Sequence, residues 1–138
     1  MKKYLSISFA ALSLLSTAGH GTEPPAIEYD GAALYMGNCS GCHGEHGAGE
    51  GIQALTLAVE PQDLRFIASR AGGEFPRWFI EQIVDGRQLR LAHGPDGMPI
   101  WGTIFTRQEG LDPAAQDRVE AEIKALVDHL ESLQIELD

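Results

Sequence analysis

Residues 39–43 read Cys-Ser-Gly-Cys-His, and they hold both of the cysteines in a chain of 138 residues. A disulfide between Cys39 and Cys42 would close a loop over only two residues, which stabilises little by the chain-entropy argument. The pair therefore needs a chemical explanation rather than a structural one.

Three chemistries use two cysteines at this spacing. A zinc site needs about four ligands, usually with a second Cys or His pair at matching spacing, and His46 and His93 do not supply that spacing. A thioredoxin-type redox pair would lie between a strand and a helix in a βαβ pattern, and the sequence shows no such alternation. The third chemistry, haem attachment, remains.

In haem attachment, two thiols add to the two vinyl groups of one haem and the adjacent histidine binds the iron. Two residues between the thiols match the separation of the vinyl groups. The sequence thus predicts one haem c, covalently bound at Cys39 and Cys42, with His43 as an iron ligand. A disulfide or a redox pair is the alternative.

A second landmark, Met98, lies 55 residues after His43 in the stretch Gly-Met-Pro-Ile-Trp-Gly. Methionine is a common partner of histidine on cytochrome c iron and raises the reduction potential, and Pro99 stiffens the loop that carries it. Met36 is too close to Cys39 to reach the opposite face of the haem, and Met1 leaves with the signal segment described next. We predict Met98 as the sixth ligand, with a core role for Met98 or ligation by His93 as alternatives.

Residues 1–18 are interpreted as a cleaved secretory signal. Lys2 and Lys3 precede an apolar run over residues 5–15, which is too short to span a bilayer and is followed by small residues. A cut after Gly21 and an uncleaved anchor helix are the alternatives. This segment predicts a periplasmic protein.

After the signal we expect a short extension, 19–28, and one domain, 29–138, a length that allows a single core. Cleavage removes two of the ten Lys and Arg and none of the twenty Asp and Glu, so the formal charge moves from −10 to −12. This charge repels phosphate backbones and argues against a nucleic-acid partner. No later segment is apolar enough to suggest a membrane span.

The chain resembles the class I mono-haem cytochrome c family through three stretches in order: CSGCHG, MPIWG and IKALVDHLESLQ. The resemblance covers about residues 29 to 134. It implies an all-α cytochrome c fold around one haem, with crossing terminal helices, and a role in carrying single electrons. The chain departs from the family at His129, where an aromatic residue usually precedes the leucine. We expect His129 to be a packing or surface residue.

Helix signals agree with that fold. Asp30 is expected to cap a helix ending at Asn38, whose Gly31 and Tyr35 resemble the family's contact at the helix crossing. A short helix is expected near residues 61–69. A further helix is expected to have Pro76 as its first residue and to end at Gly86, with an apolar face made of Phe79, Ile80, Ile83 and Val84. Asp112 and Pro113 are expected to start the last helix, whose apolar face is made of Val119, Ile123, Leu126, Leu130 and Leu133.

A buried haem propionate needs a cation or hydrogen-bond donors. Among Arg65, Arg87 and Arg90, we favour Arg87 because it directly follows Gly86. The indole N–H of Trp101 is a second candidate donor. A solvated arginine and a core tryptophan are the alternative interpretations.

With His43 and Met98 on the iron, no position is open to oxygen or peroxide, so we expect an electron carrier rather than an enzyme. The alternative is a peroxidase-like or gas-binding module with an open sixth position. A cytochrome subunit of a respiratory or dehydrogenase complex is a further possibility. The expected partners are redox proteins, with a basic docking patch complementary to the acidic chain.

Overall fold

In the computed structural model of the protein, residues 28–86 and 97–136 are described, and every regular element among them is helical. The structure agrees with the predicted all-α fold. In chain order the elements, with η for a 3-10 helix, are α1 (Gly31–Asn38), α2 (Ser40–His43), η1 (Ile52–Thr56), η2 (Leu64–Phe66), α3 (Ile67–Arg70), α4 (Arg77–Asp85), α5 (Trp101–Glu109) and α6 (Ala115–Ser132).

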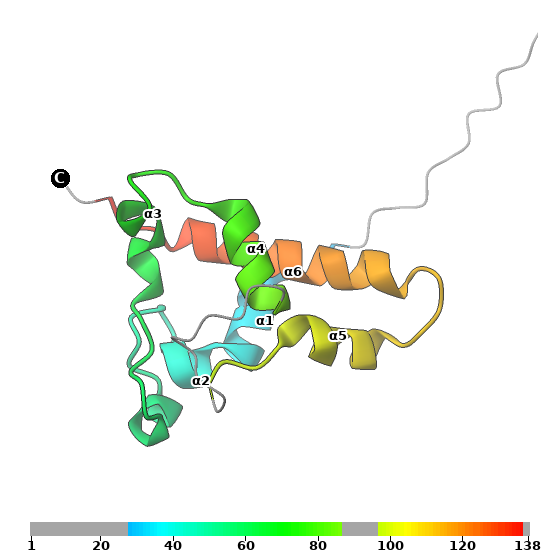
Figure 1. Cartoon of the computed structure of the whole chain (residues 1–138), viewed down its shortest axis with the longest axis horizontal. Helices are drawn as coiled ribbons and strands as arrows, with labels where there is room; N and C mark the ends of the chain where they lie inside the picture. The colour runs from blue at the N-terminus through cyan, green and yellow to red at the C-terminus, as the bar shows by residue number, and fades with distance from the viewer. Residues whose placement is uncertain (1–27, 87–96, 137–138) are drawn as a thin grey trace, which may run out of the picture.

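The long helix α6 organises the core, and α1, α4 and α5 all pack against it (Figure 1). Its buried residues recur at spacings of three and four, so one stripe of the helix faces its neighbours. The predicted stripe is confirmed: four of its residues are buried and Leu133 packs against the cluster they form. The four are Val119, Ile123, Leu126 and Leu130.

The α1–α6 crossing is as close as backbones allow. The carboxylate of Asp30 accepts hydrogen bonds from the amides of Ala32 and Ala33, both at 3.0 Å, and so caps α1 as predicted. A Cβ at Gly31 would lie 2.0 Å from the Ala125 carbonyl oxygen, so only glycine fits there. The predicted small-residue contact at the crossing is therefore confirmed.

Aromatic packing fills the rest of this crossing. The side chain of Tyr35 is fully buried, and its ring lies 5.2 Å from the ring of His129, centroid to centroid. Burial lowers the pKa of His129, against an opposing effect from Asp30. His129 is a packing residue, as expected, and it occupies the place where the resemblance implies an aromatic side chain.

Helix α4 begins one residue later than predicted. Pro76 caps it rather than being its first residue, and Gly86 ends it in the left-handed region with φ 92°. The predicted apolar face is confirmed, because Ile80 and Val84 are buried and the other two members pack against the core. Those two are Phe79 and Ile83.

The prediction for the start of the last helix is wrong in detail. Asp112 is not its cap: its carboxylate binds Arg118 and accepts from the Ala114 amide at 2.9 Å, forming a turn before α6 begins at Ala115.

The short helix expected near residues 61–69 begins later, at Leu64, because the carboxylate of Asp63 accepts from the Arg65 amide and sets its start.

Candidate haem site

The two cysteines and His43 belong to one helical turn. Cys39 is both the residue that ends α1 and the one that begins α2; its amide donates to the Tyr35 carbonyl at 2.8 Å, and its carbonyl accepts from the His43 amide at 2.9 Å. Residues three and four apart lie on the same side of a helix, so Cys39, Cys42 and His43 lie on one side of this turn. Both cysteines are free thiols in this structure.

The Cys39 thiol lacks the low pKa of a reactive redox cysteine. Burial, and next the neighbouring Cys42, raise the pKa of the Cys39 thiol to about 12, whereas a reactive CxxC pair depends on a lowered thiol pKa. Among residues 28–86 and 97–136, no three His, Cys, Asp or Glu side chains gather as a metal site. The high pKa of the Cys39 thiol argues against the redox alternative and is compatible with the third chemistry, thioether bonds to a haem.

His43 is held as a metal-binding histidine usually is. Its side chain is buried, and its Nδ1 lies 3.4 Å from the Gln62 carbonyl oxygen. With its proton on Nδ1, the ring would donate to this carbonyl, and that bond would fix the ring orientation and leave the ligating lone pair on Nε2. The residues present therefore fit a haem iron at this position.

The glycine-rich segment after His43 closes tightly against α2. Gly44, with φ 78°, turns the chain; the amide of Gly49 returns to the His43 carbonyl at 2.8 Å, and that of Gly51 to the Cys42 carbonyl at 3.1 Å. The hydroxyl of Tyr35 donates to the Gly44 carbonyl at 2.7 Å. Burial raises the pKa of Tyr35 to about 12, so this donor keeps its proton at neutral pH.

Met98 is half-buried and packs against the hydrophobic core. Several other apolar side chains that pack there are likewise only partly covered by protein. This pattern fits a site whose remaining cover is a flat apolar cofactor. They come from η2, α3, α4 and the turn before α4: Leu64, Ile67, Phe75, Phe79 and Ile83.

The other predicted site residues are placed as follows. Trp101 begins α5, is buried, and stacks on Phe105 with ring centroids 5.8 Å apart; its contact with a propionate stays a prediction. Arg87 and His93 lie outside the described residues. Arg65 forms an ion pair with Asp63 at 2.6 Å.

Comparison with known families decides the identity of the domain. The family model described as "Cytochrome C oxidase, cbb3-type, subunit III" matches residues 28–130, about three quarters of the chain. The protein belongs to this family of c-type cytochrome domains. No curated protein and no solved structure matches the chain.

As a member of this cytochrome family, the chain has an all-α cytochrome c fold and carries a covalently bound haem c with its iron. Both predictions are thus confirmed. Sequence reasoning missed two backbone acceptors at the site, the carbonyls of Gln62 and Gly44. Every residue has a carbonyl, so the sequence does not mark the ones that act as acceptors. The only side chain that could have indicated one is Tyr35, whose hydroxyl binds the Gly44 carbonyl.

Proposed function

We propose that this cytochrome transfers single electrons through one haem bound by thioether bonds at Cys39 and Cys42, with His43 and Met98 as the two iron ligands. The observation that supports it most is the single turn that carries Cys39, Cys42 and the buried His43, with Nδ1 near the Gln62 carbonyl. Bound there, the haem supplies a one-electron change of oxidation state.

The chain's own residues provide a rigid, dry setting. Tyr35 and the Gln62 carbonyl hold the loop and the imidazole that frame the cofactor. The half-buried apolar residues keep water away from the cofactor, whose one-electron change needs little structural rearrangement. Trp101, buried at the start of α5, and Arg87 are the proposed partners of the propionates.

We further propose that residues 1–18 are a cleaved signal, that 19–28 form a short extension and that 29–138 form the haem domain, which places the protein in the periplasm. Among the described residues, no helix is both long and apolar enough to span a bilayer. The family's printed name is that of an oxidase subunit, so a role as the cytochrome subunit of a respiratory complex stands beside that of a free shuttle.

Intact mass of the protein purified from its native host tests attachment and export together. The expected mass is that of a chain starting near Gly19 plus one haem, and fragmentation should place the added mass on the peptide that contains residues 39–43. A Cys42→Ala variant should keep one thioether bond, at Cys39. A full-length mass without haem would refute the proposal.

A further inference from the structure

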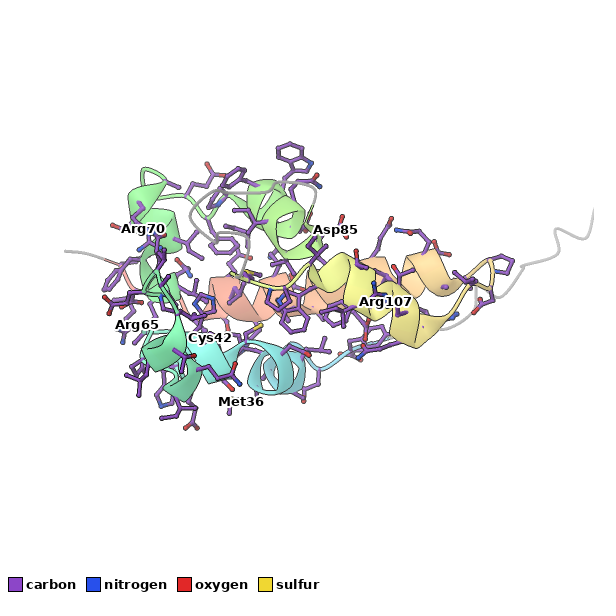
Figure 2. The ribbon with its side chains drawn as sticks, turned by 60° about the horizontal axis from the view of Figure 1, so that its bottom comes forward. Met36, Cys42, Arg65, Arg70, Asp85 and Arg107 are labelled. Atoms are coloured by element: carbon purple, nitrogen blue, oxygen red, sulfur yellow. The ribbon has the colours of Figure 1, made fainter. Side chains whose placement is uncertain are left out.

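The imidazole of His43 is approached by a backbone group from a separate stretch, residues 61–65, here named the 61–65 segment. Figure 2 labels Arg65 on this segment and Cys42 on the turn that it faces. The Gln62 carbonyl oxygen lies 3.4 Å from Nδ1 of His43, near the upper limit for a hydrogen bond. A small displacement of the segment would therefore break this bond, so whatever holds the segment in place also controls how the imidazole is bound.

One side of the 61–65 segment rests on the glycine-rich loop. The Leu64 amide donates to the Gly47 carbonyl at 2.7 Å. A Cβ at Gly49 would lie 2.5 Å from the Pro61 carbonyl oxygen, so the two backbones are in direct contact there. These contacts hold one side of the segment and leave the other side to be held by a different part of the chain.

The other side is bound by the residues that follow α6. The side-chain amide of Gln134 donates to the Leu64 carbonyl and accepts from the Ala68 amide, both at 2.9 Å. The Ile135 amide donates to the Arg65 carbonyl, also at 2.9 Å. The end of the chain therefore binds the segment and the helix after it at three backbone groups, which are 66 to 70 residues away in sequence.

Gln134 joins three elements through one side chain. Its second N–H donates to the Leu130 carbonyl of α6 at 2.8 Å, so both donors and the carbonyl oxygen of the amide are used. The side chain is half-buried, and hydrogen bonds shielded from water are stronger than exposed ones. The neighbouring Leu133 lies over the glycine-rich loop, since a Cβ at Gly47 would be 3.4 Å from its Cδ1.

We propose that Gln134 is a positioning residue for the haem iron, because it holds the 61–65 segment where the Gln62 carbonyl can bind Nδ1 of His43. This inference rests on the proposed function, in which His43 binds the iron. A hydrogen bond at the far nitrogen makes the ligating nitrogen of an imidazole more basic. A more basic ligand favours oxidised iron, so loosening the segment raises the reduction potential.

NMR of the reduced holoprotein tests the bond itself. The protein is labelled with nitrogen-15, and the exchange of the His43 Nδ1 proton with solvent is measured. We expect Gln134→Leu to speed this exchange by about tenfold, together with that of the Ala68 amide, because local opening becomes easier. Gln116→Leu removes the same side-chain amide from an exposed position of α6, where it binds Glu120. This matched control should exchange like the parent.

Potentiometry measures the consequence for the iron. We expect Gln134→Leu to favour the reduced form by about threefold over the parent, which is about 28 mV for a one-electron couple, whereas Gln116→Leu should keep the parent's potential. Ile135→Pro removes the other donor to the 61–65 segment, the amide that binds the Arg65 carbonyl. It should raise the potential as well, and it keeps the test decisive if Gln134→Leu folds poorly.

A potential at or below that of the parent in Gln134→Leu, or an unchanged exchange rate of the His43 Nδ1 proton, would overturn the positioning role. Gln134 would then only stabilise the fold, even if its replacement lowered the free energy of unfolding. Such a result would leave the proposed function standing if the optical spectrum of the parent showed a haem with two protein ligands. Absence of that spectrum in the parent would instead refute the proposed function itself.

Discussion

At the scale of single residues, the sixth ligand decides what the iron can do. Met98 packs half-buried against the core, and the proposed function requires its sulfur on the iron. Met98→Ala should keep the haem, because Cys39 and Cys42 are unchanged, but the reduction potential should fall by on the order of 100 mV and the reduced protein should bind carbon monoxide.

Potentiometry and carbon monoxide difference spectra measure these two effects. A His93→Ala variant serves as the comparison, since His93 is the competing ligand. If Met98→Ala kept the parent's potential while His93→Ala changed it, the electron-carrier interpretation would need two histidine ligands.

Glu122 is a buried acid of α6 whose Oε2 has no hydrogen-bond partner. Burial, and next the carboxylate of Glu109 on α5, raise its pKa. A raised pKa in the folded state contributes stability below the unfolded value, near 4.5, and this contribution is lost as pH rises through the folded pKa. Glu122→Gln should therefore gain stability relative to the parent as pH rises above that value.

Urea unfolding at a series of pH values measures the difference. Glu120→Gln, on the same helix but exposed, is the matched control and should run parallel to the parent. A stability difference between Glu122→Gln and the parent that stays constant over the whole pH range would show that this acid titrates alike in both states.

At the scale of elements, the α1–α6 crossing fixes the position of the attachment turn. Gly31→Ala would place a methyl group 2.0 Å from the Ala125 carbonyl oxygen, so we expect it to lower the free energy of unfolding by about 1–3 kcal/mol. Gly37→Ala, in the same helix with nothing within 4 Å of the new Cβ, should be neutral or stabilise by up to about 1 kcal/mol. Chemical denaturation of both holoproteins measures the two free energies of unfolding, and equal values would contradict this prediction.

Elements with local signals were predictable from sequence, and elements fixed by tertiary contacts were not. Asp30 and Gly86 act within a few residues of their own position, and both helix ends were predicted. Helix α5 was not, because Trp101 has no capping side chain before it and its buried face is held by α6. Asp112 was wrongly predicted as the cap of α6 because nothing in the sequence indicated that Arg118, six residues further on, binds its carboxylate.

At the scale of the whole molecule, we expect the cofactor to complete the core. Half-buried apolar side chains from several elements pack against a core cluster that includes Cys39, and the family carries a covalent haem c. The same chain produced without haem attachment should melt at least about 10 °C below the holoprotein. It should also lose much of its near-ultraviolet circular dichroism, because its aromatic side chains would be less firmly packed. Equal melting temperatures would show that the protein core is complete without haem.

The candidate site shows the same division between what sequence could and could not predict. The chemistry at residues 39–43 is local, so the thiols and His43 were found from spacing alone. Nothing in the sequence located the Gln62 carbonyl, which reaches His43 only after the chain folds back across the glycine loop.

The optical spectrum of the purified holoprotein in both oxidation states tests the central claim most directly, since it reports the haem type and both iron ligands at once. We expect the sharp bands of a six-coordinate c-type haem on reduction, the weak long-wavelength band of a methionine–iron bond in the oxidised protein, and no change when carbon monoxide is added to the reduced protein. A reduced spectrum that carbon monoxide shifts, with no methionine band in the oxidised protein, would contradict the assignment of Met98 and favour a haem with an open sixth position.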